Sequence, residues 1–361
     1  MKVGTLLRLG LSDVAARGAG LAALYAGRAD DPELVLRPSY GEVVEQAKAL
    51  EAAGFDAVFT IESSHDVFLP LGLAAAATGL EVMTNVAIAF PRSPLHLAHQ
   101  AYDLQLISQG RFALGLGSQV RPVIERAFSA PWSHPVERLR EVVLATRAIL
   151  ACWQDGGPLD FQGRFYRHTF MNPGFSPGPN PYGLPPILIG ALGPRMTRMT
   201  AEVADGLLVH PFSSERFVRE RVLPAVDEGL AAAGRDRSSF SFVSNVIVAT
   251  GRTDTEMATA EAGVRALLAF YGSTPTYRPL MELEGLLDLH LELNRLARDG
   301  RWSDMAGRID DTVLDTFAVR ALPANVAKGI ADRYGDLADR VNLYLPYPTD
   351  TALLAETATG F

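Results

Sequence analysis

The stretch PPILIGALGPRMTRMTAEVADGLLVHPFSS, residues 185–214, decides the fold, because it predicts a strand, a glycine turn, a helix and a second strand in succession. Residues 187–189 form a short, fully apolar run, which is typical of a buried parallel strand. The turn at 190–193 carries two glycines, and Pro194 follows at the first helical position, where its missing N–H costs nothing. A helix is therefore expected over 195–203.

The start of this helix is a candidate anion site. Its first backbone N–H groups have no partner within the helix and point toward the glycine turn, an arrangement that favours a phosphate. Arg195 and Arg198 oppose the helix dipole there, so we expect them to face an anion. A second apolar strand at 207–209 ends at His210, and ligands of α/β folds bind at such strand ends. The structural alternative is a strand–helix–strand repeat whose glycines only turn corners.

Composition narrows the class of protein. The chain has 361 residues, 48% of them hydrophobic and 20% charged, which is ordinary for a water-soluble globular protein. Its net charge of −8 argues against nucleic acid as the main partner. Cys152 is the only cysteine, so no internal disulfide is possible. We find no signal peptide and no apolar run long enough to span a membrane, and we expect a cytoplasmic protein.

Eight apolar runs alternate with helical patterns along the chain. This order predicts a (β/α)8 TIM barrel, formed by a single domain over residues 1–361. The predicted strands are 2–9, 56–62, 81–90, 111–117, 187–189, 207–209, 240–249 and 341–347. The predicted helices are 40–53, 69–77, 95–107, 136–153, 195–203, 215–233, 254–270 and one from 350. Insertions are expected near 11–38, 118–135, 156–184 and 278–335.

Polar residues and glycines gather where the predicted strands end, which is where barrel enzymes place their chemistry. Any one of them could be a structural residue, but the set has no shared structural explanation. The candidates are Glu62, His65 and Asp66 after the second strand, Asn85 in the third, Ser118 and Gln119 after the fourth, Gly190 to Gly193 after the fifth, and His210 after the sixth.

Several competing motifs are rejected. Gly18-Ala19-Gly20 begins a possible dinucleotide-binding pattern with an acidic residue about 20 positions later, but about eight residues separate it from the preceding strand, whereas the motif should follow directly. His96 and His99 lie three apart on a predicted helix without a carboxylate or third ligand, so no metal site is expected. The sequence contains no G-x-S-x-G elbow and no Walker loop.

Two long runs resemble the bacterial luciferase-like flavin and deazaflavin oxidoreductases. They are TNVAIAFPRSPLHLAHQAYDLQLISQGRFALGLGSQVR (84–121) and PILIGALGPRMTRMTAEVADGLLVHPF (186–212). The finer resemblance is to the coenzyme F420-dependent branch, which also shows FYGSTPTYRP (270–279) and GRWSDMAGRIDD (300–311). The resemblance extends over about residues 40–347; the 11–38 excursion is longer than is usual for the family.

The resemblance implies a barrel that holds F420, or alternatively FMN, at the strand ends. By position it implies that Asn85–Val86 is a non-prolyl cis peptide behind the cofactor ring and that Ser118 contacts the polar edge of the ring. His65 and Asp66 would face the ring where the substrate binds. Because hydride transfer requires a proton nearby, we expect His65 to be the catalytic acid–base group, with Asp66 stabilising its imidazolium or fixing its tautomer. The expected cofactor-binding residues are Glu62, Asn85, Val86, Ser118, Gln119, Gly190, Ala191, Leu192, Gly193, Arg195, His210 and Ser213.

The predicted function is therefore an F420-dependent oxidoreductase that transfers a hydride between the deazaflavin and a small organic substrate. Aromatic residues of the insertions suggest that this substrate is apolar or ring-bearing; they are Trp132, Phe161, Phe165, Tyr166 and Phe170. An FMN-dependent monooxygenase and a non-catalytic flavin-binding paralogue remain as alternatives. We also expect a homodimer that pairs through the alanine-rich helices near 69–77 and 94–107.

Overall fold

The computed structural model describes residues 1–7, 40–63 and 65–361, and the predicted excursion at 11–38 lies outside the described residues. The chain is a (β/α)8 TIM barrel, as the sequence predicts. Each predicted strand is present, although several differ in length. The barrel strands are β1 (Lys2–Leu6), β2 (Ala57–Thr60), β3 (Glu81–Thr84), β5 (Phe112–Gly117), β8 (Ile187–Ala191), β9 (Gly206–Val209), β10 (Ser241–Ala249) and β12 (Arg340–Tyr344).

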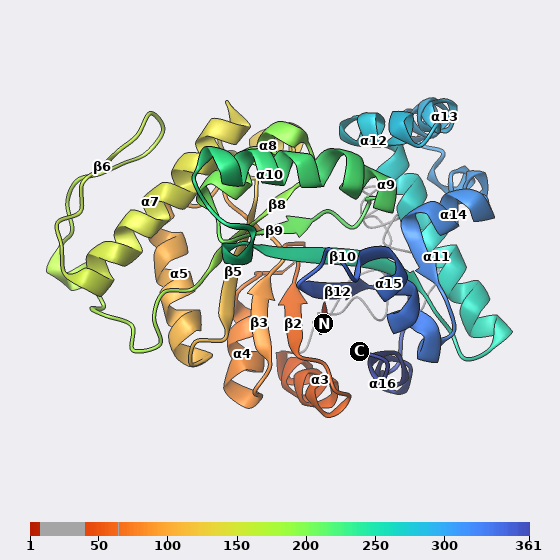
Figure 1. Cartoon of the computed structure of the whole chain (residues 1–361), viewed down its shortest axis with the longest axis horizontal. Coiled ribbons are helices and arrows are strands. Elements are labelled where there is room, and N and C mark those ends of the chain that lie inside the picture. The colour runs from red at the N-terminus through yellow and green to blue at the C-terminus, as the bar shows by residue number, and fades with distance from the viewer. Residues whose placement is uncertain (8–39, 64) are drawn as a thin grey trace. The chain divides into compact units, whose positions relative to one another are not determined.

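The described residues fall into two compact units, each with its own part of the sheet. One unit comprises Asp56–Val209 and Arg221–Val243, with parallel strands in the order β2-β3-β5-β8-β9. Figure 1 shows β2 and β3 side by side, with helix α4 next to β3. The unit also contains α4 (Leu69–Ala77), α5 (Pro94–Ile107), α6 (Arg121–Arg126), α7 (Pro135–Asp155), α8 (Pro194–Val203), α10 (Leu223–Ala232) and the short strands β4 (Ala87–Ile88), β6 (Phe161–Gln162) and β7 (Arg167–His168).

The other unit comprises Met1–Phe55, His210–Glu220 and Ser244–Phe361. In it β1 pairs with β12 in parallel, and β10 pairs in parallel with the short strand β11 (Ala318–Arg320). Within the described residues its α-helices are α3 (Tyr40–Ala52), α9 (Glu215–Phe217), α11 (Asp254–Ser273), α12 (Arg278–Leu283), α13 (Leu287–Arg298), α14 (Asp311–Phe317), α15 (Val326–Tyr334) and α16 (Thr351–Ala358), and a 3₁₀ turn, η5, lies at Pro275–Tyr277.

Two predicted elements are interrupted. The predicted helix 215–233 is divided into α9, a π-helical turn at Val218–Val222, and α10. Pro224 lies in the first turn of α10, where it has no N–H to donate to the preceding turn, and this explains the break. The predicted strand 81–90 is also divided, into β3 and β4, at Asn85 and Val86.

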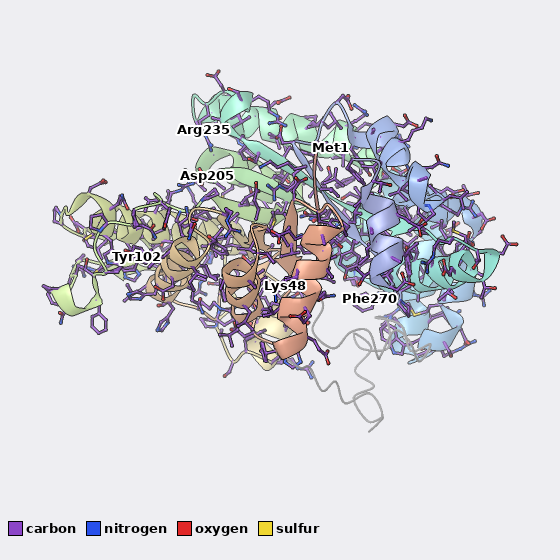
Figure 2. All side chains as sticks on the ribbon, turned by 90° about the horizontal axis from the view of Figure 1, so that it is seen from below. Met1, Lys48, Tyr102, Asp205, Arg235 and Phe270 are labelled. Carbon is purple, nitrogen blue, oxygen red and sulfur yellow. The ribbon has the colours of Figure 1, made fainter. Side chains whose placement is uncertain are left out.

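The strand–helix–strand unit around 185–214 is fixed at the amino ends of its strands. The Asp205 carboxylate accepts the backbone N–H of Ile187 at 2.8 Å and the guanidinium of Arg147 at 2.6 Å. Arg235 donates to the carbonyls of Ala201 and Ala204 at the end of α8 (Figure 2 labels Asp205 and Arg235). A cation at this position satisfies the last carbonyls of the helix and complements its dipole.

Among the described residues, none of the helices combines the length and the apolar character that a membrane span requires.

Candidate active site

Strand β3 ends in a bulge formed by a cis peptide bond between Asn85 and Val86, which confirms the geometry that the resemblance implied. Two neighbouring strands have glycines in direct proximity to the Val86 side chain. A Cβ atom at Gly117 of β5 would lie 2.5 Å from Val86 Cγ2, and one at Gly190 of β8 would lie 3.0 Å from Val86 Cγ1. The two glycines therefore leave the space that Val86 fills at the carboxyl ends of these strands.

Glu62, just beyond the end of β2, holds the segment that follows the bulge. Its carboxylate accepts the backbone N–H of Ile88 at 2.5 Å and forms a bidentate ion pair with Arg92 at 2.7 and 2.8 Å. Arg92 also donates to the Ile88 carbonyl. Both side chains of the ion pair are largely buried, so this geometry is well fixed. Both carboxylate oxygens are thus used within the chain, and a direct contact of Glu62 with a cofactor stays a prediction.

His65 and Asp66 lie in the loop between β2 and α4. His65 is half-buried, and its Nε2 atom is fully buried without a hydrogen-bond partner among the described residues. Asp66 Oδ1 accepts the N–H groups of Phe68 and Leu69 at 2.8 and 2.9 Å, which satisfies donors at the start of α4. Asp66 therefore stabilises the loop. The Nε2 atom of His65, by contrast, has no hydrogen-bond partner among the described residues.

The loop after β5 turns sharply at Gln119, whose φ is +58°. Ser118 donates to the Gln119 carbonyl at 3.2 Å, and the Gln119 side chain accepts the N–H of Val120. Left-handed backbone is uncommon for a residue other than glycine and recurs at ligand-binding loops. Both residues follow directly on Gly117, so they lie at the same sheet edge as Val86.

The predicted glycine turn is shorter than expected. Gly190 and Ala191 belong to β8 and pair with Leu208 and Val209 of β9, so they are corrected from loop to strand. The physical reason is that Gly190 accommodates Val86 inside the sheet. Leu192 and Gly193 form the turn, and a Cβ at Gly193 would meet none of the described residues within 4 Å, apart from its neighbours in the chain. The start of α8 thus opens onto space.

The guanidinium groups near the start of α8 have partners within the protein. Arg195 is exposed and pairs with Glu137 at 3.2 Å, and Arg198 pairs with Glu202 at 3.3 Å. The positive charges of Arg195 and Arg198 are therefore balanced by carboxylates of the chain, and they do not by themselves require a bound anion. The role of Arg195 in cofactor binding stays a prediction.

His210 and Ser213 belong to the other unit, directly after β9 in the chain. His210 Nδ1 accepts the N–H of Phe212 at 3.1 Å, and Nε2 lies 2.8 Å from the hydroxyl of Tyr277. Burial lowers the pKa of His210 to about 4, so the ring is neutral at physiological pH. The Ser213 hydroxyl is buried and lacks a hydrogen-bond partner within the described part of the chain.

Aromatic side chains from the insertions gather around Arg138 of α7. Its guanidinium lies 5.6 Å from the ring centroids of Phe90 and Phe165 and 5.7 Å from that of Tyr166. Trp132 packs edge-on against Phe90 at 5.4 Å. Phe90 follows β4, so this cluster begins at the strand end that carries the bulge. By contrast, Phe170 is 77% exposed.

The structure brings together the candidates of the first unit, because β2, β3, β5 and β8 are consecutive in its sheet. Two partners of the candidate residues were missed from the sequence. Arg92 stands in the exit of the third strand and pairs with Glu62. Tyr277 stands in the run 270–279 and contacts His210. Both contacts join distant positions, and only the resemblance could have drawn attention to these runs.

Comparison with known proteins gives the family and the fold. The profile of the luciferase-like monooxygenase family matches residues 14–340. An uncharacterized protein of Mycobacterium tuberculosis is 50% identical over 298 residues, which cover 82% of this chain and 88% of that protein. The 5,10-methylenetetrahydromethanopterin reductase of Archaeoglobus fulgidus is 28% identical over 308 residues, or 82% of this chain and 87% of the reductase.

Solved structures share the barrel at low identity. The coenzyme F420-dependent tetrahydromethanopterin reductase of Methanopyrus kandleri superposes with a TM-score of 0.73 at 18% identity, over 89% of this chain and 94% of that one. The oxygenating constituent of 3,6-diketocamphane monooxygenase from Pseudomonas putida, solved with FMN, gives 0.64 at 16% identity, over 99% and 97%. At these identities the likeness establishes the fold alone.

Proposed function

Because the chain belongs to the luciferase-like monooxygenase family, we propose that it is a coenzyme F420-dependent oxidoreductase that acts on a small organic substrate. The observation that carries the proposal is the buried Nε2 atom of His65, which has no hydrogen-bond partner among the described residues. A buried polar atom of this kind is costly unless a ligand completes it. Its place after β2 is where barrel enzymes bind their substrates.

The residues at the start of α8 fit the phosphate of such a cofactor. Among the described residues, Gly193 leaves open space beside the first turn of α8, whose N–H groups are not capped by an N-cap side chain. The hydroxyl of Thr197 in α8 is buried without a hydrogen-bond partner in the described part of the chain. We propose that Leu192, Gly193 and the first turn of α8 hold the phosphate.

The side chain of Val86 would support the ring of the cofactor from below. Gly117 and Gly190 keep this side chain in place, and Glu62 with Arg92 fixes the segment that follows it. Ser118 and Gln119 begin the next loop and would contact the polar edge of the ring. When bound, the deazaflavin supplies the carbon atom that gives or takes the hydride.

His65 would hold or move the proton that hydride transfer requires. A hydride added to or removed from a C=C, C=N or C–O bond leaves charge on the neighbouring atom, so a proton must move nearby. Imidazole is suited to this task at neutral pH. Asp66 would act indirectly, by capping the start of α4 and so fixing the loop that carries His65.

An FMN-dependent monooxygenase is the second candidate, because a solved neighbour on the same barrel holds FMN. The two candidates differ in the cofactor that they bind and in the use of molecular oxygen. Titration of the purified protein with F420 and, separately, with FMN, each followed by fluorescence, distinguishes them. Tight binding of FMN without measurable binding of F420 refutes the F420 proposal.

The role of His65 is tested by His65→Ala. We expect near-normal F420 affinity, together with a loss of turnover of about 10²–10⁴-fold, the usual contribution of a positioned acid–base group. His96→Ala is a suitable control, because it removes an exposed imidazole in the first turn of α5 that has no part in the proposed site. Turnover of His65→Ala at the wild-type rate would show that the proton comes from another group.

A further inference from the structure

Thr60, the last residue of β2, has a hydroxyl group that binds the loop carrying His65. Its Oγ1 atom donates to the carbonyl of Val67, seven positions later, at 2.6 Å. Both residues are buried, with Thr60 2% exposed and Val67 0% exposed. The hydrogen bond therefore fastens the far end of the loop to the strand from which the loop starts.

Other contacts fix the loop on both sides of His65. Asp66 Oδ1 accepts the N–H of Phe68 at 2.8 Å. The Phe68 ring is buried, and the Cζ atom of Arg92 lies 5.5 Å from its centroid. Arg92 is in turn paired with Glu62, near the start of the loop. All these residues belong to the unit that contains β2 and β3.

This fixation keeps one polar atom in an unfavourable place. The Nε2 atom of His65 is buried and has no hydrogen-bond partner among the described residues. An unpaired buried polar atom is costly, so a loop free to turn outward would bring Nε2 to water. The hydroxyl of Thr60 opposes that movement, because it would separate the buried Val67 carbonyl from its donor. A buried polar atom held without a partner is a feature of catalytic sites.

We infer that Thr60 is a positioning residue whose hydroxyl holds the imidazole of His65 with Nε2 buried, in position for a hydrogen bond to a bound substrate. The inference rests on the proposed function for the part that His65 plays in the reaction. The backbone of Thr60 supports the same role, since its carbonyl accepts the N–H of Asn85 at 2.7 Å. Thr60 thus connects the loop of the proposed proton donor with the segment that is proposed to support the cofactor ring.

Two substitutions at this position separate the hydroxyl from the shape of the side chain. Thr60→Val removes the hydroxyl with little change in shape, whereas Thr60→Ser retains it. Thr60→Ala also lacks the hydroxyl, and it replaces Thr60→Val if the valine variant does not fold.

Thr84→Val is the matched control. Thr84 stands beside Thr60 in the register of β2 and β3 and is 0% exposed. Its hydroxyl donates to the Gly115 carbonyl at 2.7 Å and accepts the Gly115 N–H at 2.8 Å. The control therefore loses at least as much buried hydrogen bonding as Thr60→Val, but none of it belongs to the loop of His65.

The position of the imidazole is tested by ¹⁵N nuclear magnetic resonance of the full chain, without cofactor or substrate. We expect Thr60→Val to shift the Nε2 resonance of His65, because the released loop lets this nitrogen form a hydrogen bond with water. Thr60→Ser and Thr84→Val should keep the wild-type resonance, which His65→Ala assigns. An unchanged resonance in Thr60→Val, or an equal shift in Thr84→Val, overturns the inference.

The freedom of the loop is tested by amide hydrogen exchange, followed by mass spectrometry of the segment 65–69. We expect exchange about tenfold faster in Thr60→Val, or about 1.4 kcal/mol, because one buried hydrogen bond no longer opposes local opening. In Thr60→Ser and Thr84→Val it should stay within about twofold of wild type, although urea unfolding should show Thr84→Val to be destabilised at least as much as Thr60→Val. A change of less than about twofold in Thr60→Val overturns the inference.

These outcomes are distinct from those of the proposed function. If His65→Ala turns over at the wild-type rate, the acid–base proposal fails, while the resonance and the exchange rates still decide whether Thr60 holds the imidazole. If Thr60→Val changes neither, the inference about Thr60 fails and the proposal for His65 stands on its own test.

Discussion

Gly117→Ala should displace the side chain of Val86, which we propose supports the cofactor ring, through a single contact. The new Cβ would lie 2.5 Å from Val86 Cγ2, whereas carbon atoms pack at about 3.5–4.0 Å. Val86 must therefore shift by roughly 1 Å, and overpacking of this kind costs about 1–3 kcal/mol. Alanine in a strand recovers about 0.5–1 kcal/mol relative to glycine. We expect a net loss of about 1–2 kcal/mol in the free energy of unfolding, measured by urea titration.

The contact is identified by a double-mutant cycle with Val86→Ala. That substitution removes the clashing methyl group, so Gly117→Ala should cost nothing in its background, and the coupling energy should be about 2 kcal/mol. Gly193→Ala is the neutral control, because its Cβ would meet no described residue other than its chain neighbours within 4 Å. Gly115→Ala is the opposite control, since its Cβ would lie 1.9 Å from the Thr84 carbonyl oxygen and Val86→Ala cannot relieve that clash. Additivity of Gly117→Ala and Val86→Ala within about 0.5 kcal/mol would refute the reasoning.

Three further outcomes are expected. Gly193→Leu should weaken cofactor binding while the unfolding free energy stays within about 1 kcal/mol of wild type, and unchanged binding would show that the phosphate lies elsewhere. The pKa of His210 is lowered to about 4 from an unfolded value of 6.5, so its contribution to stability is full above pH 6.5 and is lost as the pH falls toward 4. Wild type should lose about 2 kcal/mol more than His210→Gln between pH 7.5 and pH 5 in urea unfolding, and equal losses would contradict a buried neutral imidazole. Finally, α4 and α5 expose Leu69, Leu73, Leu106 and Ile107, and we expect light scattering to show a homodimer at micromolar concentration; a monomer would exclude it.

The fold could be predicted because its signals are local. Each barrel strand is a short apolar run bounded by glycine, proline or polar residues, and α4 begins and ends at the predicted residues. The division of the helix expected at 215–233 was missed, because the periodic pattern of apolar residues continues through the π-helical turn. The extension of β8 through Ala191 was missed for a different reason: glycine usually marks a turn, and here Gly190 makes room for a side chain from another strand.

The site was only partly predictable, because its contacts join distant residues. Position at a strand end singled out His65, but no pattern in the sequence reveals that Nε2 is buried and unsatisfied within the described residues. The argument from Arg195 failed to foresee Glu137, which lies 58 positions earlier and supplies the opposite charge. Tyr277 and His210 are separated by 67 positions, and their hydrogen bond depends on how α11 ends. Such pairings are set by tertiary packing rather than by local preference.

The anchoring of the strand–helix–strand unit at Asp205 and Arg235 has a consequence for evolution. These residues connect the amino ends of β8 and β9 and the last turn of α8. At the opposite end, a Cβ at Gly193 would meet none of the described residues within 4 Å apart from its chain neighbours. Mutations at Leu192 and Gly193 can therefore accumulate without unfolding the scaffold, since residues at the opposite end hold it together. This separation predicts that substitutions at residues 192–193 change the affinity of the proposed phosphate site while the scaffold stays folded.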